Sequence, residues 1–300
     1  MACIFAVSTC ALPSVAPGQD MLEQTIPIQP EQLQGIKGHR NDLSLVVRAN
    51  MQQSIDEFSS YVVATRFVSI LALQDAFVGI PSKPMVWKTP YNLVQIEITP
   101  IEAPRIMPIL FMDIIIESLI WLSQHSFVQA EFTLVEDHIR LMKAVFNPLH
   151  PSNAVATESA FVTAHQNLEA GLAPTVDITY KEGGAMFSPF EVFMVVLAFL
   201  QKVAILNKDA SMHACTFGVD ISGATEAYVQ VRGVGTRSEP EQGCTVLGII
   251  TAMWKMPIWL LGNNRLAEVK GVINNEGGPK CEVLLLKGTR PADAETPKTS

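Results

Sequence analysis

The amino-acid sequence predicts an α+β protein made of duplicated βαββ-type units, with antiparallel sheets and helices packed on one face of each sheet. Two observations lead to this fold class. Apolar and polar residues alternate in several short segments, as in strands with one buried face, and pairs of such segments follow long apolar stretches typical of buried helices. The chain has 300 residues, of which 48% are hydrophobic, which suffices for one large core or for two halves of ordinary size.

The clearest unit covers residues 94–146. It opens with the alternating strand pattern of Val94–Ile98. A helix is expected from Pro108 to Gln124, because proline at the first helical position loses no hydrogen bond. Residues 128–146 then form two alternating runs around Glu136 and Asp137, which predicts a hairpin.

A second unit with the same order covers residues 176–234. Its helix start is well defined, because Ser188, Pro189 and Glu191 have the spacing of a capping box. The spelling I-T-x-x-E follows the first strand of both units, at Ile98 and at Ile178, so we interpret the two segments as copies. Their polar alternates are expected on the sheet face opposite the helices: Gln129, Glu131, Thr133, Gln230 and Arg232.

Weaker units flank these two, which makes four in all. The first is predicted as a strand over residues 43–48, a helix over 50–66 and two runs over 67–73 and 77–87; the last is a helix over 244–261 with strands over 266–273 and 280–287. A helix and a hairpin that each expose an apolar side cannot bury it alone. The units are therefore expected to stack.

The domain organisation follows from where this pattern is interrupted. We expect a leader over residues 1–40, a first α+β half over 41–147, a linker over 148–174 that holds a short helix at 157–169, a second α+β half over 175–288 and a disordered tail over 289–300. The leader is interpreted as a signal peptide followed by a flexible segment, or as an uncleaved leader, because its apolar run has no basic residues before it. Secretion and a cytoplasmic location both stay open.

Composition argues against two classes of partner. Lys and Arg number 21 and Asp and Glu number 29, for a formal charge of −8, and no basic cluster is interleaved with aromatic residues, so we expect no nucleic-acid partner. The mean hydropathy of +0.26 is high, but the three most apolar helical stretches contain charges or proline, namely Asp113, Glu117, Glu191, Lys202, Lys255 and Pro257. We therefore predict no transmembrane span.

Two pairs of residues have side chains and a spacing that could support chemistry. Asp113 and Glu117 lie four apart on one helix and could act as acid and base, but we favour a narrow solvent-facing stripe shared with Gln124. His125 and His213 occupy matched joints and could bind a metal, but we favour cations placed near helix C-termini.

The remaining motifs are interpreted as structural. Gly233-Val234-Gly235 lacks the third glycine of a dinucleotide site, so we expect a plain loop. The five cysteines, at positions 3, 10, 215, 244 and 281, contain no C-x-x-C pair and are expected as buried thiols, with their redox state open. Trp254, Trp259, Met253 and Met256 are expected in the core, with an apolar-ligand pocket as the alternative.

The sequence therefore assigns no catalytic, cofactor-binding or metal-binding residue and no cofactor. The favoured hypothesis is a non-catalytic structural or interaction protein that presents a sheet face or strand edge. The alternative is a carrier of a small apolar ligand, or an enzyme, with a cavity between helices and sheet. A protein partner or a homo-oligomer is compatible with either hypothesis.

Overall fold

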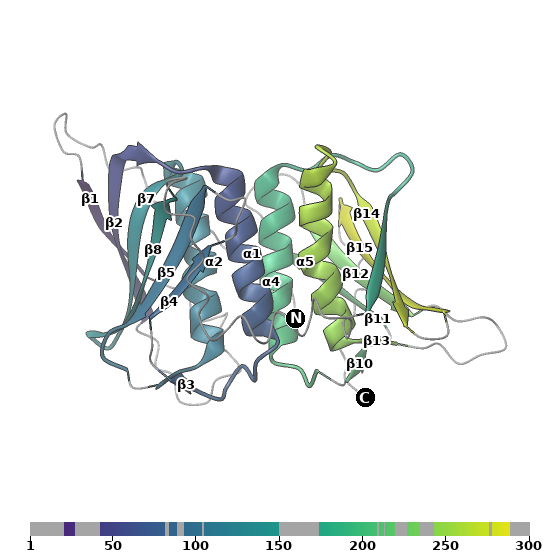
Figure 1. Cartoon of the computed structure of the whole chain (residues 1–300), viewed down its shortest axis with the longest axis horizontal. Coiled ribbons are helices and arrows are strands. Elements are labelled where there is room, and N and C mark those ends of the chain that lie inside the picture. The colour runs from purple at the N-terminus through teal and green to yellow at the C-terminus, as the bar shows by residue number, and fades with distance from the viewer. Residues whose placement is uncertain are drawn as a thin grey trace. The chain divides into compact units, whose positions relative to one another are not determined.

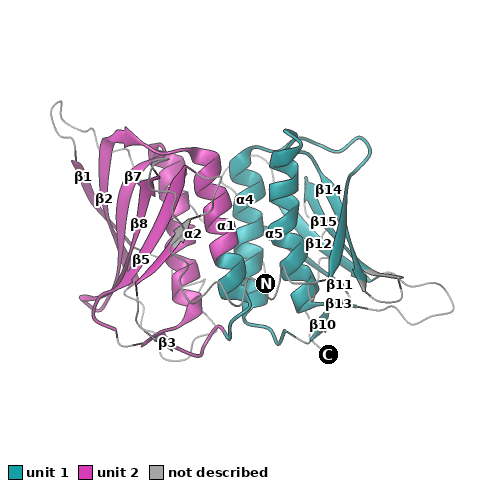
Figure 2. Cartoon of the chain, viewed as in Figure 1, with its two compact units in different colours: residues 1–8, 68–75, 160–300 teal, residues 9–67, 76–159 magenta. Residues whose placement is uncertain are grey.

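The computed structural model describes most of the chain and confirms the α+β fold class with antiparallel sheets and helices on one face of each. The described residues are 21–27, 43–81, 84–88, 93–103, 105–149, 174–208, 210–212, 214–219, 227–233, 243–275 and 278–288. Strands and helices alternate along this part of the chain in two successive series (Figure 1). Figure 2 divides the molecule into two compact units, which are described separately below.

The N-terminal sheet lies in unit 2 and is antiparallel throughout, with the strand order β1-β2-β7-β8-β5-β4. Its strands in the described residues are β1 (Met21–Pro27), β2 (Leu43–Ser54), β4 (Met85–Lys88), β5 (Val94–Pro100), β7 (Val128–Glu136) and β8 (Ile139–Pro148). β7 and β8 form a tight hairpin, in which Asp137 and His138 both have positive φ, of 47° and 71°. Two successive positive φ angles are typical of a type I′ turn, whose twist matches that of the strands.

Helices α1 (Glu57–Ala72) and α2 (Pro108–His125) accompany this sheet. The inward alternates of the strands are buried, and α2 packs on them through Trp121, whose ring lies 5.7 Å from that of Phe132. Phe132 in turn contacts Phe146 of β8 at 5.8 Å. The short strands β3 (Ile80–Pro81) and β6 (Arg105–Ile106) pair with each other ahead of α2. The last turn of α1 and the following loop, residues 68–75, group with unit 1.

The C-terminal sheet lies in unit 1 and is also antiparallel, with the order β11-β12-β15-β14-β9. Its strands are β9 (Thr175–Tyr180), β11 (Ala214–Val219), β12 (Ala227–Gly233), β14 (Val269–Asn275) and β15 (Gly278–Lys287). Helices α4 (Pro189–Ala204) and α5 (Val246–Gly262) cover one face, and β10 (Ser211–Met212) pairs with β13 (Cys244–Thr245) ahead of α5. The capping box of α4 is confirmed, because Ser188 and Glu191 exchange both of its hydrogen bonds.

The two series are duplicates, element for element. β2, α1, β3, β4, β5, β6, α2, β7 and β8 correspond in order to β9, α4, β10, β11, β12, β13, α5, β14 and β15. The strand order of the second sheet is reproduced by the corresponding strands of the first, and the pairing of the two short strands recurs as well. Four helix-plus-hairpin units are thus present in the described residues, but the hairpin after α1 is β4–β5 and not the runs over 67–73 and 77–87 expected from the sequence.

The alignment of the two clearest units was wrong, however. The strand before α2 is β5, which lies beside β8 in the middle of its sheet. The strand before α4 is β9, an edge strand that pairs with β14. The true equivalent of β9 is therefore β2, and the shared spelling I-T-x-x-E is coincidental. The error arose because successive helix-plus-hairpin units have the same local order.

Two further expectations near the N-terminus are corrected. Residues 50–54 continue strand β2, and the helix extends over residues 67–72, where hairpin strands were expected. The helix begins later because Asp56 accepts a hydrogen bond from the Ser59 N–H, which caps its first turn. Residues 21–27, expected as part of a flexible leader, form β1, which pairs along β2 from Met21 to Pro27.

Several sequence-based expectations concern residues outside the described part of the chain. These are the signal peptide, the short helix at 157–169 with most of its linker, the loop Val234–Gly235 and the tail at 289–300. The division of the chain at residues 148–174 stays a prediction. Among the described helices, none combines the length and apolar character needed to cross a membrane.

Candidate functional site: grooves on the outer faces of the sheets

The face of each sheet opposite its helices is polar and carries a groove. In the N-terminal sheet this outer face holds the polar alternates of β2, β5, β7 and β8, including the expected Glu131 and Thr133. Strand register places Val46, Thr133, Lys143 and Thr99 in one row across four strands. Arg48 and Glu131 face each other in the next row.

The N-terminal groove has a volume of about 440 Å³. Its lining residues are Val46, Arg48, Thr99, Pro100, Ile101, Glu131, Thr133, Arg140 and Lys143. Three of these are cations and one is a carboxylate, in a chain whose formal charge is −8. The groove is therefore a locally basic surface on an acidic protein.

A β-bulge brings Arg140 to this groove. The register of the β7–β8 hairpin shifts between Leu134, which pairs with Met142, and Val135, which pairs with Arg140. In a regular strand Arg140 would share the buried face of Met142, because residues two apart point to the same side. The extra residue, Leu141, turns the exposed Arg140 side chain to the outer face, as bulges commonly do.

The cations of the N-terminal groove differ in their partners. Lys143 Nζ lies 3.2 Å from Glu131 Oε2, and Arg48 Nε lies 3.4 Å from Glu23 Oε2. The guanidinium of Arg140 forms neither an ion pair nor a hydrogen bond with any described residue. Arg140 is thus the cation in this groove that is available to a ligand.

The C-terminal sheet has a groove of about 550 Å³ on its outer face. Its lining residues are Thr179, Tyr180, Lys181, Glu182, Tyr228, Gln230, Arg232, Lys270, Glu282, Leu284 and Leu286. The expected Gln230 and Arg232 therefore lie on this face, and they are hydrogen-bonded to each other. Lys270 Nζ lies 3.2 Å from Glu282 Oε1.

The two grooves are lined in part by residues at equivalent positions of the duplicated fold. Register aligns Arg48, Thr99, Glu131 and Lys143 with Thr179, Arg232, Lys270 and Glu282, respectively, and all eight line a groove. The cross-strand bridge is kept with its polarity reversed, as Glu131–Lys143 in one sheet and Lys270–Glu282 in the other, each with partners 12 residues apart. This recurrent spacing of opposite charges, which sequence reasoning missed, is the signal in the sequence that could have located the grooves.

The carboxylates of Asp113, Glu117 and Glu191 lie outside both grooves. Asp113 is only 2% exposed, so its expected place on a solvent-facing stripe of α2 is wrong. Glu117 is half-buried and Gln124 is exposed. Neither Asp113 nor Glu117 lines either groove, and Glu191 is engaged by the α4 cap and by Lys287 Nζ at 3.0 Å.

The expected histidine pair is described only in part. His125 Nδ1 lies 3.0 Å from the Trp121 carbonyl oxygen, and its ring stacks on Trp121 at 4.3 Å, at the C-terminal end of α2. His213 lies outside the described residues. Across the described chain, no group of three or more His, Cys, Asp or Glu side chains is placed to hold a metal ion.

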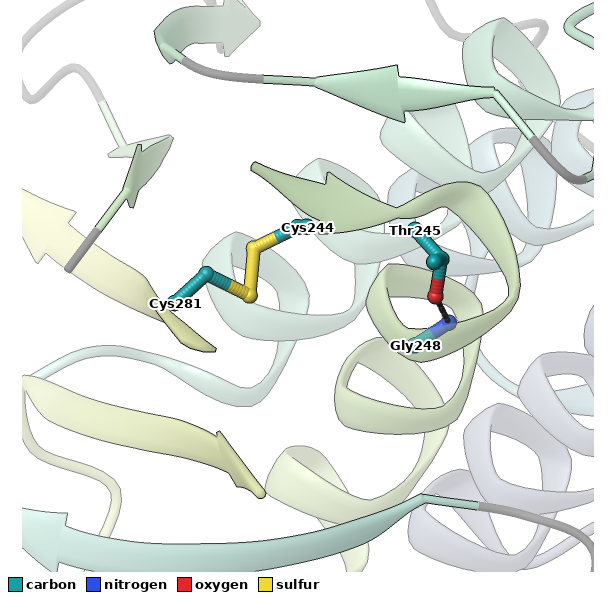
Figure 3. Close-up of a disulfide and its surroundings, with 4 residues drawn as sticks. All are labelled: Cys244, Thr245, Gly248 and Cys281. Carbon is teal, nitrogen blue, oxygen red and sulfur yellow. Dashed lines mark hydrogen bonds between the residues drawn. A yellow bond between two sulfur atoms is a disulfide. The ribbon is translucent and has the colours of Figure 1, made fainter. Parts of the chain in front are cut away.

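The cysteines correct one expectation. Cys244 of β13 and Cys281 of β15 form a disulfide beside the start of α5, where the Thr245 hydroxyl accepts a hydrogen bond from the Gly248 N–H (Figure 3). They are therefore not the buried thiols expected from the sequence. Cys215 is a buried free thiol, and burial raises its pKa to about 11, which keeps it protonated and poorly nucleophilic.

The Met and Trp residues of α5 contribute to packing. Met253 and Met256 are fully buried, while Trp254 and Trp259 are half-buried. The Trp259 ring lies 4.8 Å from that of Tyr180, and the Arg265 guanidinium lies over the Tyr180 ring at 4.5 Å. This aromatic contact anchors the edge strand β9 to α5.

No protein-family model matches the chain, and no curated protein matches its sequence. Among solved structures, the chain is similar to the crystal structure of the tandem DUF26 ectodomain from the Arabidopsis thaliana cysteine-rich receptor-like protein PDLP8. The identity is 7% and the TM-score 0.23, over 81% of this chain and 97% of that one. A similarity this low supports no inference about function.

Proposed function

We propose that the protein is a non-catalytic interaction protein that engages other molecules through the polar outer faces of its two sheets. The observation that carries this proposal is the occurrence of a charged groove at the same place on both sheets. Each sheet uses its inner face to bury a core against helices, which leaves the outer face for contacts. A polar groove at the equivalent position of each sheet is suited to binding another molecule.

The chemistry of the groove linings favours binding over catalysis. Among the described residues that line the two grooves, none is a Ser, Cys or His, the side chains most often used as nucleophiles or as bases near neutral pH. Of the three carboxylates in the linings, Glu131 and Glu282 are each held in an ion pair with a lysine, and Glu182 is exposed. Such groups recognise charged partners through hydrogen bonds rather than transform them.

We further propose that the protein works in an oxidising compartment. The Cys244–Cys281 disulfide supports this, because disulfides persist in secreted and extracytoplasmic proteins and are rare in the cytosol. Mass spectrometry of protein from its native source, without reduction, tests the point: the two cysteines are expected to be linked in nearly all molecules. Free thiols at both positions would contradict an oxidising location.

Lysine acylation tests the binding proposal. The purified protein and the protein in a native-source extract are acetylated under the same conditions, and modification is quantified by mass spectrometry. We expect Lys143 of β8 or Lys270 of β14, both partly exposed on the outer faces, to be modified at least threefold less in the extract. Lys202 of α4 and Lys255 of α5, which are half-buried on the helices, are the matched controls and should not change.

The same experiment can reject the proposal. Unchanged modification of Lys143 and Lys270 in the extract would contradict outer-face binding. Protection of the helix lysines alone, together with an apolar molecule that co-purifies in native mass spectrometry, would instead support the carrier alternative.

A further inference from the structure

We propose that the N-terminal groove binds an oxyanion, meaning a carboxylate, phosphate or sulfate group, through Arg140 with support from Arg48 and Lys143. This inference rests on the proposed function and specifies the ligand chemistry of one of its two grooves. It follows from the charge of the groove, from the placement of the three cations and from the state of Arg140.

The three cations lie in successive rows across the groove, with Lys143 between Arg48 and Arg140. The row Val46–Thr133–Lys143–Thr99 crosses four strands, and the row that contains Arg48 and Glu131 lies beside it. Arg140 lines the groove on the other side of Lys143, towards the β7–β8 turn. Neighbouring strands are about 4.8 Å apart, and residues two positions apart along a strand are about 6.8 Å apart, so a single oxyanion group is comparable in size to the space between these rows.

The polar groups of this space are mostly hydrogen-bond donors. Lys143 carries an ammonium group, Arg48 and Arg140 carry guanidinium groups, and the hydroxyls of Thr99 and Thr133 can donate as well. Glu131 is the carboxylate of the lining, and it is neutralised by Lys143 at 3.2 Å. A cation would be repelled by these groups and a neutral apolar ligand would displace their water without replacing its hydrogen bonds, whereas an oxyanion can accept from several of them.

Arg140 is the residue expected to determine affinity. Its guanidinium has no partner among the described residues, so a ligand does not have to displace one. The planar guanidinium can donate two parallel hydrogen bonds to one oxyanion, which makes arginine a preferred residue for such groups.

The C-terminal groove lacks this arrangement. The β14–β15 hairpin has a bulge at the equivalent position, between Ile273 and Asn274, but Pro279 occupies the place of Arg140. Arg232 of that groove is hydrogen-bonded to Gln230. We therefore assign oxyanion binding to the N-terminal groove and expect the other groove to be a weaker site or none.

Titrations with inorganic phosphate, inorganic sulfate and citrate test the proposal. They are followed by nuclear magnetic resonance on the full chain, at constant ionic strength set with chloride. We expect at least one of the three anions to give saturable shifts of the amides of residues 99–101 and 140–143, and the preferred anion identifies the ligand group. In Arg140→Gln the affinity for that anion should fall at least tenfold.

Arg105→Gln is the matched control. This substitution changes the net charge by the same amount, and Arg105 is also exposed but lies outside the groove. It should alter the affinity less than twofold. Non-saturable shifts with all three anions, or equal effects of the two substitutions, would overturn the proposal. If lysine acylation still shows Lys143 protected in the extract, the outer face binds a ligand of different chemistry, and the proposed function survives without the oxyanion assignment.

Discussion

The N-terminal and C-terminal halves arrange the same elements in the same order but stabilise them with different chemistry. In the C-terminal half a disulfide links Cys244, ahead of α5, to Cys281 in β15. The N-terminal half has Ile106, which like Cys244 is buried two residues ahead of its helix, and Met142, which strand register aligns with Cys281. A covalent link is thus present in one copy of the fold and absent from the other.

The two halves also differ in the polar side chain at the start of the central hairpin, which is Glu268 in the C-terminal half and Gln129 in the N-terminal half. Glu268, which is 4% exposed, accepts hydrogen bonds from Lys181 Nζ at 2.9 Å, from the Ala185 N–H at 3.3 Å and from the Lys287 N–H at 2.8 Å. Register aligns Glu268 with Gln129, whose amide donates to Asn147 Oδ1 at 2.7 Å. One half uses a buried carboxylate where the other uses neutral amides.

The edges of the two sheets differ as well. β2 is covered along its edge by β1, whereas the corresponding β9 pairs only with β14 within the described residues. An extra strand satisfies backbone groups that an edge leaves open. The two halves thus share their order of elements but differ in the disulfide, the buried polar groups and the edge strand that stabilise it.

The largest predicted effect concerns the disulfide. Replacing both cysteines, as Cys244→Ser with Cys281→Ser, should destabilise the C-terminal half by about 2–4 kcal/mol, because the link closes a loop of 37 residues. Hydrogen exchange should accelerate in β14 and β15 and stay unchanged in β7 and β8. Cys215→Ala, which removes a buried thiol but leaves the link intact, is the control: without reductant its exchange should match the wild type, and reductant should accelerate exchange in β14 and β15 of this variant but not of the double variant. Equal acceleration in both halves would show that they unfold as one unit.

The second prediction concerns Glu268. Glu268→Gln should lower the free energy of unfolding by about 2 kcal/mol at pH 7, because hydrogen bonds to a buried charge are lost. Burial alone would raise the pKa of this carboxyl, but the hydrogen bonds from Lys287, Lys181 and Ala185 outweigh it and lower the pKa. The stabilisation is therefore present above the ordinary carboxyl pKa and is lost as the pH falls through the lowered one.

Urea unfolding at several pH values, read out by exchange in β15, measures this effect. The difference between the wild type and Glu268→Gln should shrink as the pH falls below about 4. In the N-terminal half, Glu131→Gln breaks a partly exposed ion pair and should cost less than about 1 kcal/mol. A cost for Glu131→Gln as large as that for Glu268→Gln would refute the distinction between the two halves.

Local sequence patterns were sufficient for most of the fold. Helices α2 and α4 and their hairpins follow from apolar periodicity and from helix-start signals at Pro108 and Ser188. The first unit was misread because the run over residues 67–72 is as apolar as a buried strand and only the cap at Asp56 fixes where the helix lies. β1 was missed because its sequence, MLEQTIP, does not alternate between apolar and polar residues, although its burial alternates in the structure.

The candidate site was harder to predict, for a different reason. The sequence placed Glu131, Thr133, Gln230 and Arg232 on the outer faces, since alternation alone decides that. It could not place Arg140, whose face is set by a bulge that reverses the alternation. It also could not pair Cys244 with Cys281, because connectivity depends on which strands become neighbours. Long-range pairing, rather than local preference, determined what was missed.

The smallest predicted effect concerns β1, the strand that only the N-terminal sheet has among the described residues. Gln24 of β1 accepts a hydrogen bond from the indole N–H of Trp121 at 3.3 Å, and Trp121 is 2% exposed. Gln24→Ala should cost about 1 kcal/mol, because it leaves a buried donor without its partner. Exchange should accelerate in β2 towards that of β9, its equivalent at the open edge. Glu23→Ala, on the other face of the strand, breaks an exposed ion pair with Arg48 and should change the stability by less than about 0.5 kcal/mol. If both substitutions leave the exchange of β2 unchanged, Gln24 does not anchor β1 to the core, and the backbone pairing alone accounts for the covered edge.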